Sequence, residues 1–257
     1  MSNLVPVSTQ WTLDAAGSTG RHAIESVYMI VCPKTSSKGT GWLLKNGQMI
    51  TNEHVVRNCS VSDVFAISSF GVQHTFKNLV VDAGADLALL TPNDALKGGM
   101  DLDLGRPPDV GTTVTTWGFP LGYNGPAPLL CVGHLAGFSE HKTSSGTSKH
   151  LVVNGAFNPG NSGGPLFRAN SDLVIGVVVS KHAPITQFHM MAIEALANNK
   201  SGVVFSGTDG NGKPVQFVES QLVADILTYF RNLTQVMIGE AISSSTVVDF
   251  LKKHGAA

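Results

Sequence analysis

The residues best suited to chemistry lie in one stretch, residues 158–166, with the sequence Asn-Pro-Gly-Asn-Ser-Gly-Gly-Pro-Leu. Glycines leave few steric neighbours around Ser162, so a bulky substrate could reach its hydroxyl. The backbone N–H groups of Gly160 and Ser162 could then bind the oxyanion that forms when the hydroxyl attacks a carbonyl. The alternative is a glycine-rich turn with an incidental serine. We favour the first interpretation, which predicts acyl transfer and requires a base and an acid elsewhere.

His54 is the candidate general base. It lies in residues 51–56, Thr-Asn-Glu-His-Val-Val, directly after a segment that should form a strand. Neighbouring valines can hold a histidine in one rotamer, which a general base requires. The alternative is a solvent-facing histidine at the start of a short helix. None of the 9 histidines falls in an H-x-x-x-H or H-E-x-x-H spacing, so the sequence predicts neither a metal site nor a cofactor.

Asp86 is the candidate acid that orients the histidine. It directly precedes residues 87–90, Leu-Ala-Leu-Leu, which should form a short buried strand. A carboxylate anchored there could accept the histidine Nδ1–H and fix the tautomer. Asp82 is the competing acid, but it lies in the preceding turn, where an ordinary turn-capping role is expected. We therefore predict that His54, Asp86 and Ser162 act together.

These three segments resemble the histidine, aspartate and serine segments of chymotrypsin-like serine peptidases, and the Asn-Pro before the glycines resembles the HtrA/Deg branch in particular. Their order along the chain, His then Asp then Ser, is the chymotrypsin-like order. The resemblance covers residues from about 24 to 181 and from about 235 to 253, and it leaves nothing for a PDZ domain. It implies an all-β fold of two six-stranded antiparallel β-barrels with the triad in the cleft between them. It also implies a serine endopeptidase that hydrolyses protein or peptide substrates.

The same resemblance assigns residues to substrate binding. Ala156, six residues before the serine, stands at the base of the pocket for the P1 side chain, with Phe157 beside it. Neither is an acid that would bind Arg or Lys, so we predict small or medium apolar P1 residues. Val179, Ser180 and Lys181 should flank the substrate and pair with its backbone as an added strand. A plain core strand is the alternative for most of that segment.

Two other functions remain as alternatives. A pseudo-protease or holdase would bind unfolded segments by strand addition without cutting them, but the complete set of triad residues argues against it. An esterase or other acyl transferase would use the same triad, and a comparison of peptide and ester turnover would separate the two. Relatives in the HtrA/Deg branch are commonly trimers. The N-terminal arm prevents that property from being carried over, so monomer and homo-oligomer both stay open.

The composition fits an all-β protein. The 257 residues are 42% hydrophobic and 14% charged, with 28 Gly, which suits a sandwich or barrel with many turns. The formal net charge of −1 and the lack of a basic run argue against nucleic acid or an anionic membrane as partner. No apolar run is long enough to span a bilayer, and residues 1–7 lack the blocks of a signal peptide. If Met1 is the native start, these features predict a cytoplasmic protein.

We expect an N-terminal arm and one protease domain with a helical insertion. The expected parts are the arm (1–22) and the domain (23–257), which contains barrel one (about 23–106), a linker (104–111), barrel two (about 112–257) and the insertion (about 183–234). Helical signals lie at residues 187–198 and 216–232 of the insertion. It could cap the cleft, make an oligomer contact or cover a barrel edge, and packing over an edge is the commonest fate of an amphipathic helix. A closing helix should start near Thr246, with that residue as its N-cap.

Three cysteines, Cys32, Cys59 and Cys131, cannot all pair, and their spacing forms no C-x-x-C motif. We therefore expect buried free thiols. Secreted chymotrypsin-like enzymes often carry a disulfide beside the histidine, and Cys59 lies near His54. No cysteine stands at the usual partner position, so that bridge is not expected.

Overall fold

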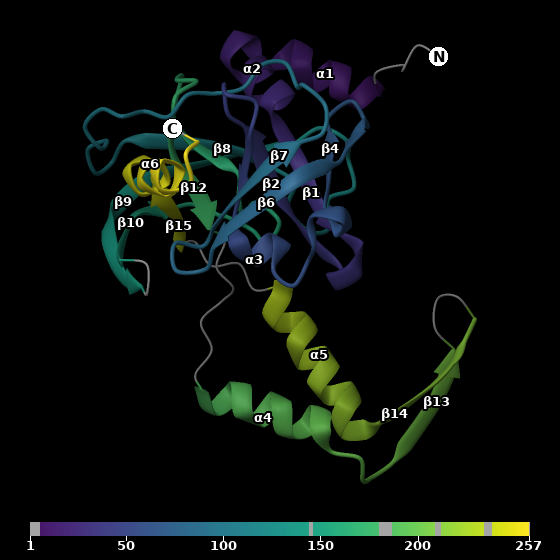
Figure 1. The fold of residues 1–257 in the computed structure, drawn as a ribbon. Coiled ribbons are helices and arrows are strands. Elements are labelled where there is room, and N and C mark those ends of the chain that lie inside the picture. Colours follow the sequence, from purple (N-terminus) through teal and green to yellow (C-terminus); the bar gives the residue numbers. More distant parts are fainter. Residues whose placement is uncertain (1–5, 144–145, 180–186, 209–211, 234–237, 257) are drawn as a thin grey trace. The chain divides into compact units, whose positions relative to one another are not determined.

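The computed structural model describes residues 6–143, 146–179, 187–208, 212–233 and 238–256 (Figure 1). The chain divides into two units, which are described separately. One unit comprises Met1–Lys181 together with Met237–Ala257, and the other comprises His182–Val236. No helix within the described residues is long and apolar enough to cross a membrane.

The first half of the larger unit is an open antiparallel sheet of seven strands, in the order β5-β4-β1-β2-β3-β7-β6. Its strands are β1 (Val27–Cys32), β2 (Ser37–Leu43), β3 (Met49–Thr51), β4 (Phe65–Ser68), β5 (Gln73–His74), β6 (Phe76–Asp82) and β7 (Leu87–Pro92). The Asn46-Gly47 pair between two short apolar segments predicts a hairpin, and β2 does pair with β3 across that turn. The expected closure into a six-stranded barrel is not confirmed. Among the described residues, no ladder joins the two edges β5 and β6.

The edge of this sheet formed by β4 and β5 has short strands, and the cause is local. The valines, phenylalanine and isoleucine of residues 61–67 predict one strand. Instead, Ser60 and Asp63 form a reciprocal capping box that turns η2 (Val61–Asp63) into a 3-10 helix. Strand β4 therefore begins only at Phe65, and its neighbour β5 is two residues long. So little backbone is left at this edge that the ladder needed for closure does not form.

The second half forms a closed antiparallel barrel of six strands, which confirms the expected second barrel. The strands are β8 (Thr113–Gly118), β9 (Leu129–Thr143), β10 (Gly146–Asn154), β11 (Pro165–Arg168), β12 (Val174–Val179) and β15 (Ile238–Ser243). Their inward side chains fill the barrel with a separate apolar core that includes Leu135, Val153, Phe157 and Val178.

A larger apolar core joins the open sheet to the closed barrel. Trp42 and Leu87 come from the sheet, Phe167 comes from the barrel, and Phe250 comes from the closing helix α6 (Ser244–Lys253). The N-cap of α6 is Ser243, whose Oγ accepts from the Thr246 N–H, so the predicted cap at Thr246 is wrong by three residues. Thr246 itself is buried within the first turn.

The N-terminal arm is helical, although its sequence shows no clear period. Helices α1 (Val7–Ala15) and α2 (Gly17–Ser26) pack on the open sheet, as Figure 1 shows at the top of the molecule. Buried hydrogen bonds fasten them: Thr9 Oγ1 donates to Ser69 O, and Ser69 Oγ donates to Ile24 O, both at 2.9 Å. These contacts are polar and long-range, so hydrophobic periodicity could not reveal them.

The smaller unit contains two helices and one hairpin. They are α4 (Gln187–Asn198), β13 (Val204–Thr208), β14 (Pro214–Val218) and α5 (Glu219–Leu233). Helix α4 has the predicted bounds. Helix α5 starts three residues later than predicted, because residues 214–218 pair with β13 instead of entering the helix.

Cys32 and Cys59 form a disulfide, so the expectation of free thiols is wrong for this pair. Cys32 ends β1, a position other than the usual one for a partner of the cysteine near the histidine, and the bridge was therefore missed. Cross-linking residues 27 apart in the sequence stabilises the fold by about 3.5 kcal/mol in the chain-entropy description. Cys131 is free and partly buried, and burial raises the pKa of its thiol.

Candidate active site

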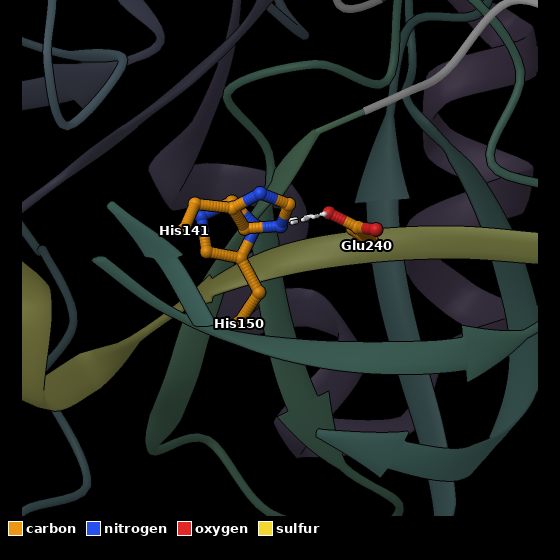
Figure 2. A group of neighbouring side chains, drawn as sticks. All are labelled: His141, His150 and Glu240. Atoms are coloured by element: carbon orange, nitrogen blue, oxygen red, sulfur yellow. Dashed lines mark hydrogen bonds and ion pairs between the residues drawn. The ribbon is translucent and has the colours of Figure 1, made fainter. Parts of the chain in front are cut away.

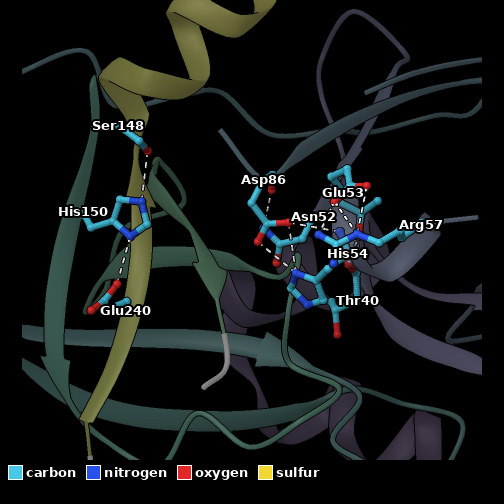
Figure 3. A network of polar contacts seen from close by, with 10 residues as sticks. Thr40, Asn52, Glu53, His54, Arg57, Asp86, Ser148, His150 and Glu240 are labelled. Atoms are coloured by element: carbon cyan, nitrogen blue, oxygen red, sulfur yellow. Dashed lines mark hydrogen bonds and ion pairs between the residues drawn. The ribbon is translucent and has the colours of Figure 1, made fainter. Parts of the chain in front are cut away.

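His54 and Asp86 form a hydrogen-bonded pair (Figure 3). His54 Nδ1 lies 2.8 Å from Asp86 Oδ2 and 3.0 Å from Oδ1, and the His54 backbone N–H donates to Oδ1 at 3.0 Å. The side chains are 34% and 26% exposed, respectively. A partly buried carboxylate that accepts both N–H groups fixes the ring orientation and selects the tautomer with its proton on Nδ1. The other ring nitrogen, Nε2, is then the basic one.

Two neighbouring strands bring this pair together. Strand β3 leads into helix α3 (Glu53–Val56), which carries His54, whereas Asp86 directly precedes β7. Because β3 and β7 pair antiparallel, the residues after one strand lie beside the residues before the other. Asn52 Nδ2 donates to the Asp86 carbonyl at 2.9 Å and ties the two ends together. Asp86 has a φ of 53°, a left-handed conformation that aspartate adopts more readily than most residues.

Helix α3 is held by packing and by an ion pair. Val55 and Val56, the valines beside His54, are buried in the core of the open sheet. Arg57 Nη2 donates to Glu53 Oε2 at 2.6 Å, and this bonding raises the pKa of the Arg57 guanidinium. Glu53 is only 7% exposed, so its charge is neutralised where water is scarce. The short helix therefore holds the backbone of His54 in a fixed position.

Asp82, the competing acid, has the turn role that was expected. Its Oδ1 accepts from the N–H groups of Gly84 and Ala85 at 3.0 and 3.1 Å, and Lys253 Nζ donates to Oδ2 at 2.9 Å. These bonds stabilise the turn that leads to Asp86. They also tie that turn to the closing helix α6.

The serine loop (residues 158–164) packs against β2 and against the end of β3, the strand that leads to His54. The Thr40 N–H donates to Ser162 O at 2.8 Å. The next residue, Gly163, has a φ of 86°, and a Cβ there would overlap Thr40 O and Thr51 Oγ1. Only glycine can place the loop this close to β2 and β3. Ser162 is 3% exposed in this arrangement.

The peptide before Gly160 has a fixed direction. The Leu121 N–H donates to Pro159 O at 2.7 Å. Because a trans peptide is planar, the Gly160 N–H points away from that carbonyl and so away from Leu121. The next carbonyl along the chain is also held, because Thr40 Oγ1 donates to Gly160 O at 2.7 Å. Gly160 has a φ of 95°, and a Cβ there would overlap the backbone of residues 119–121.

The predicted substrate-binding residues lie in different environments. Ala156 is partly buried, whereas Phe157 is 3% exposed and fills the barrel core beside Gly239. Val179 ends β12 and packs against the core shared by the sheet and the barrel. The contacts of these three residues with a substrate stay predictions. Ser180 and Lys181 lie outside the described residues.

Thr40 is a positioning residue that the sequence reasoning missed. Its hydroxyl donates to Gly160 O and accepts from the Phe119 N–H at 3.0 Å, so it joins β2 to both loops around the site. Thr40 is fully buried. The only local signal is a threonine between two glycines, Gly39 and Gly41, which is too common a pattern to identify the role.

A second group of titratable side chains also escaped the sequence reasoning. His141, His150 and Glu240 each offer one ligand atom, and these atoms lie within 4.8 Å of one another. The three residues come from three strands of the closed barrel, so no local spacing motif connects them. The sequence predicted no metal site for that reason.

Comparisons with known proteins agree with this fold. Residues 39–177 match the trypsin-like peptidase domain family. Protease Do-like 1 from Arabidopsis thaliana chloroplasts is 29% identical over 235 residues, which cover 87% of this chain and 46% of the relative. Protease Do-like 2, also chloroplastic, is 30% identical over 54% of this chain and 23% of its own length. The chain thus spans less than half the length of these curated relatives.

Solved structures support the fold at low sequence identity. The active form of the Rv3671c protease from M. tuberculosis matches with a TM-score of 0.61 and 17% identity, covering 95% of this chain and 87% of that one. The HtrA-type protease AlgWS227A with tripeptide matches with a TM-score of 0.57 and 18% identity, covering 75% and 66%. The resemblance to HtrA/Deg proteases is therefore confirmed. The chain belongs to the trypsin-like peptidase family, and its named relatives are Do-like proteases.

Proposed function

We propose that this chain is a serine endopeptidase in which Ser162 is the nucleophile, His54 the general base and Asp86 the orienting acid. The observation that carries the proposal is the hydrogen bond of 2.8 Å between His54 Nδ1 and Asp86 Oδ2. That bond gives the imidazole the orientation and the tautomer that a base needs. Family membership and the packing of the serine loop on β2 and on the end of β3, beside His54, support the assignment.

In the proposed mechanism, Ser162 Oγ attacks a peptide carbonyl while His54 Nε2 takes its proton. Asp86 stabilises the imidazolium that forms. His54 then protonates the leaving amine, and an acyl-enzyme with an ester bond to Ser162 remains. Water attacks this ester with His54 again as base, which releases the acid product and restores the serine.

The N–H groups of Gly160 and Ser162 are the proposed oxyanion donors. The fixed direction of the Pro159–Gly160 peptide supports this assignment. The Leu121 N–H holds the Pro159 carbonyl on one side of the peptide, so the Gly160 N–H points to the opposite side. One such donor contributes about 3 kcal/mol to transition-state binding in enzymes of this kind. Thr40, which holds the Gly160 carbonyl, is a positioning residue for the same feature.

The proposed specificity is for small or medium apolar P1 residues. Ala156 offers no charge at the base of the pocket, and the side chain of Phe157 is already committed to the barrel core. A peptide library with a variable P1 position should give the highest kcat/KM with side chains such as Ala or Val. Fastest cleavage after Arg, Lys, Asp or Glu would contradict this part of the proposal.

The direct test is casein hydrolysis by the wild type and by Ser162→Ala. The wild type should release soluble peptides, and the variant should lose essentially all of this activity. Ser206→Ala, which changes an exposed serine in the smaller unit, is the matched control and should hydrolyse casein like the wild type.

Two outcomes would replace the proposal with one of the alternatives. Turnover of activated esters without cleavage of casein or peptides would indicate an esterase. Binding of unfolded casein with no hydrolysis of either substrate class, and no difference between wild type and Ser162→Ala, would indicate a holdase of the same fold.

A further inference from the structure

Three polar side chains converge on the outer face of the closed barrel (Figure 2). On β10, Leu151 belongs to the barrel core, so its neighbour His150 points to the opposite face. On β15, Ala241 belongs to that core, so Glu240 also points outward. Glu240 pairs with Val152, two residues beyond His150 on the same face.

His141 reaches the same face from β9. It stands directly opposite Ser148, and residues that face each other in an antiparallel pair lie on one side of the sheet. Ser148 and His150 are two residues apart on β10 and share that side. Three adjacent strands therefore contribute one side chain each to the His141, His150 and Glu240 cluster.

The distances within this cluster fit a transition-metal ion. Glu240 Oε2 lies 3.0 Å from His150 Nδ1 and 3.2 Å from His141 Nε2. A zinc ion about 2.0–2.1 Å from each ligand in tetrahedral geometry would separate neighbouring ligand atoms by about 3.3–3.4 Å. All three ligand atoms lie within 4.8 Å of one another, so side-chain rotations would bring them to these separations. The two imidazole rings already lie close, with centroids 4.3 Å apart.

The burial of His150 and Glu240, and a hydrogen bond to the outer nitrogen of His150, also favour a metal site. The side chains of His150 and Glu240 are 11% and 10% exposed, whereas His141 is 44% exposed and leaves the cluster open to solvent on one side. Ser148 Oγ lies 2.9 Å from His150 Nε2, the ring nitrogen that faces away from Glu240. Metal-bound histidines almost always donate their second N–H to such a partner, which fixes the tautomer and the ring.

We propose that His141 Nε2, His150 Nδ1 and a carboxylate oxygen of Glu240 bind one Zn²⁺ ion, with solvent in the fourth position. Two imidazoles and one carboxylate suit zinc, copper or nickel far better than calcium or magnesium, which prefer sets of oxygen ligands. The alternative is a metal-free network in which Glu240 simply accepts hydrogen bonds from the histidines. Both arrangements use the same three residues, so a measurement of zinc binding is needed to distinguish the metal site from the metal-free network.

The test is a zinc titration of the full chain against a chromophoric chelator after dialysis against EDTA. The wild type should bind one equivalent. His141→Ala, chosen because this exposed residue can be changed without opening the core, should weaken binding by about tenfold or more, and so should Glu240→Gln. Ser148→Ala should weaken binding by about tenfold, because His150 Nε2 loses its hydrogen bond to the Ser148 hydroxyl. Zinc should also raise the Tm of the wild type, and at the same zinc concentration it should raise that of His141→Ala by clearly less.

Two control variants make the result specific. His134→Ala removes an exposed histidine from β9, the strand that carries His141, and should bind zinc like the wild type. His54→Ala should also keep the site, which separates it from metal held at the His54 and Asp86 pair. Absence of stoichiometric binding in the wild type, or equal affinity in the wild type, His141→Ala and Glu240→Gln, would overturn the proposal. Calcium or magnesium bound as tightly as zinc would also overturn it.

Discussion

At the scale of single residues, Asp86 is the most constrained member of the site. Its carboxylate accepts from the ring and from the backbone of His54, and its own carbonyl accepts from Asn52. The first of these bonds sets the tautomer of the imidazole, and the others set the position of the carboxylate. Changing the charge of this residue should therefore affect chemistry much more than folding.

Asp86→Asn should lower kcat for casein by about 10⁴-fold with little loss of stability, because an amide can hold the ring in the wrong tautomer. Initial rates and urea unfolding would measure the two effects. Asp82→Asn is the control. Asp82 lies four residues before Asp86, where it caps a turn and pairs with Lys253. A loss of activity in Asp82→Asn as large as that in Asp86→Asn would contradict the assignment of the acid.

His74 should make folding sensitive to mild acid. Burial lowers the pKa of His74, and the charge of Asp94 opposes this only in part. The unfolded chain therefore takes up the proton at a higher pH than the folded chain. The contribution to stability is complete above the ordinary histidine pKa of about 6.5 and is lost as the pH falls through it toward the lower folded value.

The variant His74→Gln cannot titrate and should lose less unfolding free energy than the wild type between about pH 7.5 and 5.5. Urea denaturation at the two pH values would measure the difference. The exposed residue His134 provides the control, because His134→Gln should follow the wild type. An identical pH dependence in the wild type and His74→Gln would show that burial of this imidazole does not affect stability.

At the scale of elements, the serine loop depends on close backbone packing against β2 and β3. Thr40 bonds to Ser162 and Gly160, and Gly163 leaves no room for a side chain. These contacts orient the loop relative to His54 without any side-chain bond that a sequence motif could reveal. The glycines of the motif are therefore structural requirements of the loop as well as openings for substrate.

Gly163→Ala should destabilise the fold by about 3 kcal/mol or more, because the added Cβ overlaps backbone and side-chain oxygens at a positive φ. Gly47→Ala is the matched control. Gly47 has a nearly equal φ of 84°, but a Cβ there would meet nothing within 4 Å, so about 1 kcal/mol is expected. Equal midpoints of urea unfolding for the two variants would contradict the packing described for the serine loop.

The sequence predicted the elements whose cause is local. The Asn46-Gly47 hairpin, the bounds of α4 and the positions of His54, Asp86 and Ser162 beside strands all follow from short motifs. It failed where distant residues decide the structure. The N-terminal helices depend on buried polar bonds to Ser69, and the Cys32–Cys59 bridge depends on the end of β1 and the turn after α3 meeting in space.

At the scale of the whole molecule, the smaller unit is an insertion between two adjacent strands. Strands β12 and β15 pair antiparallel, with Val179 opposite Glu240. The ends of these two strands are therefore adjacent in the barrel, and a short hairpin loop could join them in place of the insertion. The described residues that form the three apolar cores all belong to the larger unit.

Deletion of residues 182–236 should thus leave a folded protease domain. The remaining five residues between Val179 and Glu240 suit a hairpin loop, and the thermal midpoint should stay within about 4 °C of the wild type, equivalent to about 1 kcal/mol. Calorimetry would measure this. Loss of the cooperative transition would show that the larger unit needs the insertion to fold.

Prediction of the whole fold succeeded for the closed barrel and fell short for the open sheet. The closed six-stranded barrel is what the resemblance to chymotrypsin-like peptidases implies, and that resemblance rests on the motifs around His54, Asp86 and Ser162. Closure of the first sheet depended on an edge where Ser60 and Asp63 favour a 3-10 turn over a strand. The His141, His150 and Glu240 cluster was likewise invisible, since it requires the register of three paired strands.

The measurement that tests the central claim most directly is the location of a fluorophosphonate adduct. The reagent labels a serine only where a neighbouring base activates it. Intact mass and peptide mapping should find one adduct per chain, on Ser162, in the wild type and none in Ser162→Ala or His54→Ala. An adduct on another residue, or labelling of His54→Ala at the rate of the wild type, would contradict the proposed triad.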